Sequence, residues 1–304
     1  MDQSRTGAPT PFWRTQYPVD LIEHVLAVKG PMWLCDEIRR DEDPSYVQHH
    51  LEWEMLGFVP REKFSGARVL DFGCGSGAST MILARLLPDA KIAGVELVPE
   101  FVELARHRAA FYGVERQVEF HRSNNALDLP AGIGQFDYVV MSAVYEHLLP
   151  AERRSLLPAL WRALKPGGVL FLNGTPHRWF PVEQHTTGFP LLNYLPRPLV
   201  HWITCRYCGR VGRNESWNDL LRRGIRGATQ REVLRVVAAG GTPGFALTPC
   251  REGIHDEIDL WLAMSGSLRR RGAKQWFAHL ARGLKAVTGL SLTPCIAMAI
   301  QKPR

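Results

Sequence analysis

The chain has 304 residues, of which 45% are hydrophobic and 22% are charged, and its formal net charge is +7. This composition is ordinary for a globular protein and excludes a wholly disordered, collagen-like or low-complexity chain. The six cysteines are too few and too scattered for a disulfide framework, and no run of about 18 apolar residues predicts a membrane span. Since the sequence also opens without an apolar signal core, we expect a cytoplasmic protein.

Residues 1–65 predict an N-terminal helical cap. Apolar residues recur at helical spacing over 21–26 and 47–55, and an acidic stretch at 36–43 separates the two runs. We expect this cap to close over a ligand through its aromatic and imidazole side chains, namely Trp13, Tyr17, His49 and His50.

Residues 66–173 alternate between short apolar runs and helical stretches. The predicted strands are 68–71, 91–97, 118–122, 136–142 and 169–172, and the predicted helices are 79–87, 99–111 and 151–164. Strands that alternate with helices of this length predict a parallel sheet with right-handed crossovers. We therefore expect an α/β, Rossmann-like three-layer sandwich.

The remaining chain predicts an addition to this core. Residues 174–228 are rich in proline, aromatic residues and histidine and indicate an insertion or lid after the fifth strand. Residues 229–304 predict a helix at 229–239 and two last strands, near 245–248 and 296–300, which would complete a mostly parallel sheet of seven strands.

A glycine-rich loop follows the first predicted strand. Gly73, Gly75 and Gly77 permit positive φ angles and let a ligand lie against bare backbone, and a helix N-terminus follows. Glu96 comes 19 residues after Gly77 at the end of the second strand, where a carboxylate accepts from ribose hydroxyls. These residues alone leave open an NAD(P)-dependent oxidoreductase, whose fingerprint fits Gly73, Gly75 and Ala78, and a tight turn without a ligand.

Five segments in order resemble the motifs of class I S-adenosylmethionine-dependent methyltransferases, and their pattern is similar to the small-molecule branch of the ubiquinone-biosynthesis type. They are residues 69–77, Glu96, and residues 125–130, 136–148 and 164–168. The resemblance implies S-adenosyl-L-methionine as cofactor and methyl transfer by in-line displacement to a small-molecule or lipid-linked acceptor, at oxygen. A methyltransferase-like binding protein without turnover is a further alternative.

The resemblance also implies a set of cofactor-binding residues: Asp71, Gly73, Gly75, Gly77, Glu96, Leu97, Asn125, Ala126 and Ser142. Asp71 would lie near the ammonium group, directly or through water, and the glycine backbone would pack against the methionine and ribose parts. Ser142 with Ala143 would line the methionine part, Glu96 would hold the ribose, and Leu97, Asn125 and Ala126 would contact the adenine. The family has an acid at the position of Asn125. An amide oxygen accepts the same hydrogen bond without charge assistance, so we expect weaker cofactor binding.

His147, which follows the fourth strand, is the candidate general base, and its alternative role is to hold the shape of the turn. We expect the acceptor pocket to be walled by aromatic and imidazole side chains of the insertion: His177, Trp179, His185, Tyr194 and Trp202. No metal site is expected, because Cys205 and Cys208 have the spacing of half a zinc site without a clear second pair. Cys250 and His255 are the alternative completion.

The positive charge is concentrated in residues 197–304, where 18 Lys and Arg face 7 Asp and Glu. Residues 268–287 carry six basic residues and no acid, with an apolar stripe of Trp276, Leu280, Leu284 and Val287. This helix predicts peripheral contact with an anionic membrane, or a surface helix docked on the protein by the stripe. No nucleic-acid partner is expected, since no stacking-rich or helix-turn-helix motif accompanies the charge.

Overall fold

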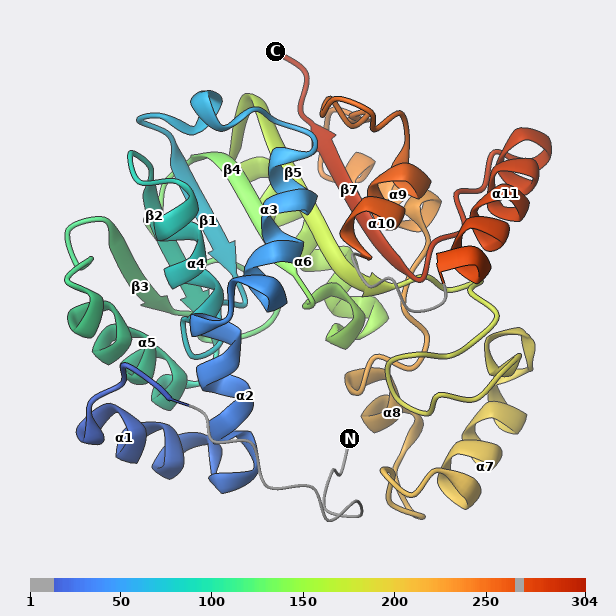
Figure 1. Cartoon of the computed structure of the whole chain (residues 1–304), viewed down its shortest axis with the longest axis horizontal. Helices are drawn as coiled ribbons and strands as arrows, with labels where there is room; N and C mark the ends of the chain where they lie inside the picture. The colour runs from blue at the N-terminus through green and yellow to red at the C-terminus, as the bar shows by residue number, and fades with distance from the viewer. Residues whose placement is uncertain (1–13, 266–270) are drawn as a thin grey trace.

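The computed structural model describes residues 14–265 and 271–304. Its centre is a seven-stranded sheet in the order β3-β2-β1-β4-β5-β7-β6 (Figure 1). The strands are β1 (Arg68–Phe72), β2 (Lys91–Glu96), β3 (Val118–Arg122), β4 (Phe136–Ser142), β5 (Leu164–Pro176), β6 (Phe245–Ala246) and β7 (Cys295–Gln301). The first five pair in parallel, and β7 is antiparallel to β5 and β6. The predicted mostly parallel seven-stranded sheet is confirmed.

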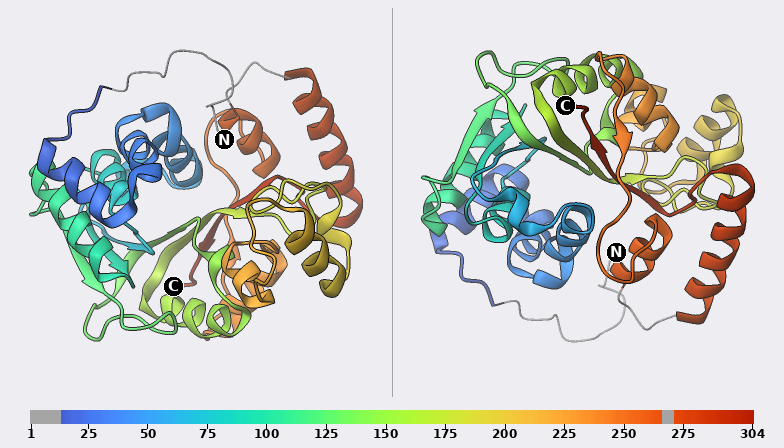
Figure 2. Two further views of the ribbon diagram at one scale, coloured as in Figure 1. Left: turned by 90° about the horizontal axis from the view of Figure 1, so that it is seen from below. Right: turned by 90° about the horizontal axis from the view of Figure 1, so that it is seen from above.

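Helices cover both faces of the sheet and make the three predicted layers (Figure 2). One face packs on α3 (His49–Leu56), α4 (Ala78–Leu86) and α5 (Pro99–Tyr112), and the other packs on α6 (Pro150–Ala163) and α9 (Gln230–Ala238). The side chains of successive residues in β1 pack against helices on opposite faces of the sheet. Val69 lies in the first apolar cluster and Leu70 in the second, because side chains alternate across a strand.

The N-terminal helices lie against the glycine-loop end of the sheet. α1 (Val19–Lys29) and α2 (Pro31–Glu42) pack on α5 through a small apolar cluster of their own. A short π-helical turn, Pro44–Gln48, then leads into α3. Most of residues 19–56 is therefore helical, whereas residues 14–18 and 57–60 lie outside helices.

The insertion after β5 forms a separate apolar cluster. It contains the one-turn helix Leu192–Tyr194, α7 (Arg197–Tyr207) and α8 (Trp217–Arg222), whose buried side chains pack mainly on one another. The C-terminal segment adds α10 (Glu257–Met264), which contacts α3, and α11 (Arg271–Thr288), which packs on α10. Within the described residues, none of the helices has both the length and the apolarity to span a membrane.

Candidate cofactor and acceptor site

A cavity of about 870 Å³ opens at the carboxyl ends of β1 and β4. Its floor includes Gly73, Gly75 and Ser76 of the glycine loop, together with Ser142 and Ala143 at the end of β4. The N-terminal helices and α10 close it from the other side. Open α/β sheets bind their ligands at this edge. Of the residues predicted to bind a cofactor, Gly73, Gly75 and Ser142 line the cavity.

The three glycines of the loop are required for three different reasons. Gly73 has φ +73°, and a Cβ there would lie 2.6 Å from Cγ2 of Val144. Gly77 has φ +84°, and a Cβ there would lie 2.7 Å from Cβ of Ala105, so this glycine packs the loop on α5. Gly75 has φ +55° and nothing within 4 Å of its Cβ position. Gly75 therefore presents bare backbone to the cavity, which suits a ligand that lies against the chain.

Asp71 lies beneath the loop and is not part of the cavity wall. Its carboxylate accepts hydrogen bonds from Thr80 Oγ1 at 2.6 Å and from Ser79 Oγ at 3.2 Å. Burial raises the pKa of Asp71 to about 6, although these hydroxyls counteract the shift. The side chain joins β1 to the start of α4, and its contact with a ligand's ammonium group, direct or through water, stays a prediction.

Glu96 ties β2 to the glycine loop. Its Oε2 accepts from the Gly75 amide at 3.0 Å, and its Oε1 accepts from the Leu97 and Val98 amides at 2.6 and 3.1 Å. Each carboxylate oxygen keeps further acceptor capacity. The neighbouring Leu97 is 41% exposed and offers a free apolar face.

Asn125 and Ala126 lie in the turn after β3, outside the walls of the cavity. Asn125 is exposed, and its Oδ1 accepts from the Leu127 amide at 2.8 Å, which closes a local turn. Its side-chain NH₂ donors remain for a ligand, whereas the amide oxygen is already engaged. The acceptor role expected for Asn125 would therefore share one oxygen between two donors.

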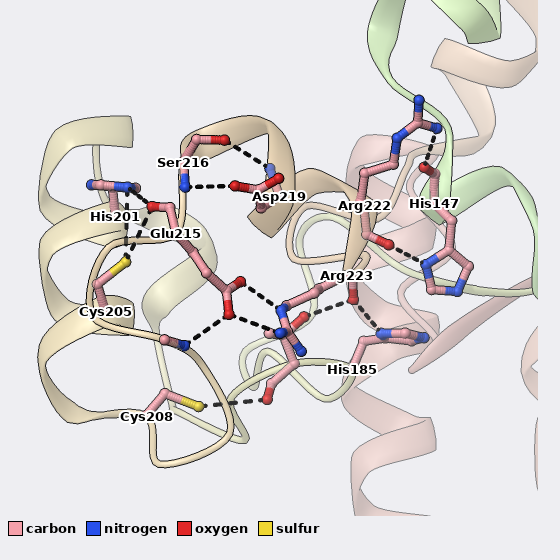
Figure 3. A network of polar contacts seen from close by, with 12 residues as sticks. His147, His185, His201, Cys205, Cys208, Glu215, Ser216, Asp219, Arg222 and Arg223 are labelled. Atoms are coloured by element: carbon pink, nitrogen blue, oxygen red, sulfur yellow. Dashed lines mark hydrogen bonds and ion pairs between the residues drawn. The ribbon is translucent and has the colours of Figure 1, made fainter. Parts of the chain in front are cut away.

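His147 lines the cavity from the short helix Tyr145–His147 that follows β4. Its Nδ1 lies 2.6 Å from the carbonyl oxygen of Arg222 (Figure 3). A carbonyl only accepts, so Nδ1 carries a proton and Nε2 is the nitrogen left for chemistry. The structure thus shows the turn-holding contact and also leaves one ring nitrogen available.

Among the insertion residues expected to wall the acceptor pocket, His185 lines the cavity. Trp179 and Tyr194 are 41% and 48% exposed and stack on each other, and Trp202 is 56% exposed. His177 is buried, accepts from the Trp179 amide through Nδ1, and has its pKa lowered by burial to about 4. None of these four residues lines the cavity. Its aromatic side chains come instead from other segments, as Trp33, Tyr46, Phe101 and Trp261.

Of the described N-terminal cap residues expected to close over a ligand, one lines the cavity and two do not. His50 lines the cavity. Its pKa is lowered mainly by burial and to a lesser extent by the neighbouring His49. His49 is directed to the carbonyl of Met264 at 3.1 Å, and Tyr17 donates to Asp41 at 2.5 Å in a buried contact away from the cavity. Trp13 lies outside the described residues.

Sequence reasoning missed Glu37, which fastens the cap to the glycine loop. Ser76 Oγ donates to Glu37 Oε2, Arg108 Nη2 lies 3.2 Å from the same oxygen, and Lys29 Nζ lies 3.4 Å from Oε1. Although burial opposes it, the charges of Arg108 and Lys29 and the bond from Ser76 hold the pKa of Glu37 below its usual value. The hydrogen bond between Ser76 and Glu37 therefore joins the N-terminal cap to the glycine loop.

Sequence reasoning also missed Glu54, a buried carboxyl in the cavity wall. The side chain is directed inward from α3, and burial raises its pKa to about 8. The signal was present in the sequence, because Glu54 shares the buried stripe of its helix with Leu51 and Met55. An acid on such a stripe is costly unless it serves a site.

The two cysteines with zinc-like spacing do not gather ligands in the described part of the chain. Cys205 Sγ and Cys208 Sγ each approach a backbone carbonyl at 3.7 Å, those of Glu215 and Thr186 (Figure 3). Their helix and loop pack into the apolar cluster of the insertion. Cys250 and His255 do not join them in a cluster of three or more possible ligands among the described residues.

The basic helix α11 docks by a different face from the one expected. Ala278 and Ala281 are buried against the α10 side, whereas the exposed fractions of Trp276, Leu280 and Val287 are 66%, 52% and 87%. The prediction of a helix docked by its apolar stripe is therefore wrong, because small residues allow the closer approach. Arg282 and Lys285 form ion pairs with the carboxylates of α10. Residues 268–270 of the predicted helix lie outside the described residues.

Comparison with known proteins places the glycine loop and the strands around it in a family. Residues 69–168 match a model described as a methyltransferase domain. A ubiquinone biosynthesis O-methyltransferase of Xanthomonas oryzae pv. oryzae is 37% identical over 141 residues, which cover 44% of this chain and 56% of that protein. A ribosomal protein L11 methyltransferase of Vibrio cholerae is 30% identical over 164 residues, which cover 50% and 52%. The chain therefore spans about half the length of the curated relatives it matches.

Among solved structures, the S-adenosylmethionine-dependent methyltransferase SibL in its apo form is similar over 84% of this chain and 55% of that chain. The identity is 16% and the TM-score is 0.45.

Proposed function

The chain belongs, through residues 69–168, to the class I S-adenosylmethionine-dependent methyltransferases, and we propose that it transfers the methyl group of S-adenosylmethionine to a small-molecule acceptor. The observation that supports the proposal most is the sheet order, in which β7 is inserted antiparallel between β5 and β6. A dinucleotide-binding sheet of the ordinary kind has the order 3-2-1-4-5-6 in parallel. The order found here favours methyl transfer over the oxidoreductase alternative.

The chemistry of the loop fits this cofactor. Gly75 offers open backbone to the cavity, which Ser142 also lines, and Glu96, which accepts from the Gly75 amide, keeps acceptor capacity for ribose hydroxyls. Bound S-adenosylmethionine supplies a methyl group that is already activated by a positive sulfur. The protein's task is then to orient the acceptor and exclude water, and such positioning supplies a large share of the rate.

We assign the acceptor atom as oxygen and His147 as the catalytic residue. Methylation of a hydroxyl releases a proton, and Nε2 of His147 is the ring nitrogen left to receive it, because Nδ1 is bonded to the carbonyl of Arg222. General-base help of this kind contributes about 10²–10⁴-fold. The ubiquinone biosynthesis relative is named for methylation at oxygen, which supports the same choice.

The cavity walls indicate the shape of the acceptor. Tyr46, Phe101 and Trp261 supply flat apolar surface, and Glu54 adds a buried carboxyl that is largely protonated near neutral pH. A ring-bearing acceptor with hydroxyl groups satisfies both features, because the ring packs on the aromatic side chains while a hydroxyl meets the carboxyl.

A lipid-linked acceptor is the finer form of the proposal. The exposed stripe of α11 supports it, since Trp276, Leu280 and Val287 form one apolar face and an indole suits the membrane interface. Sedimentation with anionic vesicles tests it: Trp276→Ser should reduce the bound fraction. Trp202→Ser, which removes a similarly exposed indole from α7, should not. Equal losses, or no binding at all, would contradict membrane contact.

The first experiment for the proposed function is calorimetric titration with S-adenosylmethionine and S-adenosylhomocysteine, with NADH and NADPH as controls. Binding of the first pair alone supports the proposal, and binding of a nicotinamide alone refutes it. A panel of hydroxylated aromatic acceptors then separates an enzyme from a protein that binds the cofactor without turnover.

A further inference from the structure

Three possible metal ligands from two separate segments meet at the wall of the cavity, where His147 and His185 line it and Glu146 is buried behind them. Glu146 and His147 follow β4, and His185 comes from the insertion after β5. One atom from each side chain lies within 4.8 Å of the other two. Nε2 of His147 and Nε2 of His185 are both 3.8 Å from Oε1 of Glu146.

The protonation of both rings is fixed by consecutive carbonyls at the end of α8. Arg222 O accepts from Nδ1 of His147 at 2.6 Å, and Arg223 O accepts from Nδ1 of His185 at 2.7 Å (Figure 3). The last carbonyls of a helix have no partner within it and are free to accept such bonds. A neutral ring held in this way carries its proton on Nδ1 and directs a lone pair from Nε2.

The third group is a buried carboxylate with one oxygen left over. Glu146 is 1% exposed, its Oε2 accepts from Thr175 Oγ1 at 2.8 Å, and its Oε1 has no hydrogen-bond partner. The distance of 3.8 Å to each ring is too long for a hydrogen bond. Two imidazole lone pairs and one carboxylate oxygen therefore converge with no donor between them, an arrangement that a cation stabilises.

We propose that Glu146, His147 and His185 bind a divalent transition-metal ion of the zinc class. Two imidazoles and one carboxylate are a ligand set of catalytic zinc sites, which keep a further position open. In a tetrahedral site of this kind neighbouring ligand atoms are about 3.3 Å apart, so each 3.8 Å separation from Glu146 must shorten by about 0.5 Å, and the two imidazole nitrogens, which lie within 4.8 Å of each other, must also approach. Magnesium and calcium prefer sites made of oxygen atoms and are disfavoured here.

The surroundings hold the three ligands in the manner of a metal site. Each ring is oriented by a carbonyl and the carboxylate by a hydroxyl, which are the usual outer partners of metal ligands. Gly224 has φ +85°, and a Cβ there would lie 2.8 Å from Nδ1 of His185 and 3.2 Å from Cγ of Glu146. The glycine therefore leaves the room that the ring and the carboxylate occupy.

The role of the ion rests on the proposed methyl transfer to oxygen. His147 and His185 line the same cavity as Ser142, so the open position of the ion would face the acceptor. An acceptor hydroxyl bound to such an ion has a lowered pKa and releases its proton to water. In this arrangement His147 would bind the ion. The ion, rather than His147, would then promote loss of the proton from the acceptor hydroxyl.

The test measures metal binding directly on the full chain. Protein stripped with a chelator is titrated with zinc by calorimetry, retained metal is counted by elemental analysis after dialysis, and cobalt substitution is followed by visible absorption. We expect one zinc ion per chain. His185→Ala and His147→Ala should each weaken binding by at least about 100-fold, because even outer partners of metal ligands contribute about 10–100-fold.

Two further variants keep the test decisive. Glu146→Gln preserves the shape of the buried side chain and the bond from Thr175, so it should fold and still lose affinity. His121→Ala is the matched control, because His121 on β3 also lies near a glutamate, 3.4 Å from Oε1 of Glu119, but outside the cavity. It should bind zinc as the unmodified chain does.

The outcomes separate the metal site from the methyltransferase proposal. A chain that takes up no zinc, or whose zinc affinity survives His185→Ala, overturns the site even if methyl transfer is found. A chain that binds one zinc through these residues but neither S-adenosylmethionine nor S-adenosylhomocysteine keeps the site and refutes the methyltransferase proposal.

Discussion

Replacement of Glu54 by glutamine should change how the stability of the protein depends on pH. In the folded chain burial raises the pKa of this carboxyl from its ordinary 4.5 to about 8. Because the folded-state pKa is the higher one, the unfolded chain loses its proton first, and the contribution of Glu54 to stability falls as pH rises from about 4.5 to about 8. A rise of that size corresponds to at most about 5 kcal/mol.

Glutamine has nearly the same shape and does not ionise, so the variant should lack this loss. Relative to the unmodified protein, the free energy of unfolding of Glu54→Gln should increase by up to about 4 kcal/mol between about pH 5 and about pH 8.5. Urea denaturation at the two pH values measures it. Glu52→Gln on the same helix, at a less buried position, is the control. A difference that is the same at both pH values for Glu54→Gln would refute the reasoning.

Three substitutions test the proposed site. Glu96→Ala should weaken S-adenosylhomocysteine binding at least about tenfold, since it removes a charged acceptor and the bond to the Gly75 amide; an unchanged dissociation constant in calorimetry would remove Glu96 from the ribose. Asn125→Asp should tighten binding modestly by restoring a charged acceptor in the turn, and a clear loss would contradict the adenine contact. His147→Ala should lower turnover and leave the cofactor dissociation constant unchanged; retained turnover with a hydroxyl acceptor would make this residue structural.

The sheet could be predicted because its determinants are local. Strands β1, β2, β4 and β5 each contain an apolar run that is buried on both faces, as is usual in a parallel sheet. Of the strand predicted near 245–248, only Phe245–Ala246 is a strand, because only these two residues pair with Cys295–Gln301, about fifty residues later in the chain.

The sequence located the glycine loop better than the acceptor side. Gly73, Gly75 and Ser142, named from the sequence, line the cavity, and Glu96 contacts the loop through the Gly75 amide. His185 was named only as one of several insertion residues, and nothing in the sequence shows that it meets His147. That meeting depends on the carbonyls of Arg222 and Arg223, which belong to every residue type and leave no mark in a sequence.

The separate apolar cluster of the insertion has a consequence for how this protein can diverge. Its buried side chains pack on one another rather than into the two layers of the sheet, so substitutions within it leave the cofactor platform intact. The same segment supplies His185 and the carbonyls that orient both histidines. Exchange of this one stretch would therefore change the contacts that orient His147 and His185, while the two apolar layers around the sheet would keep their packing.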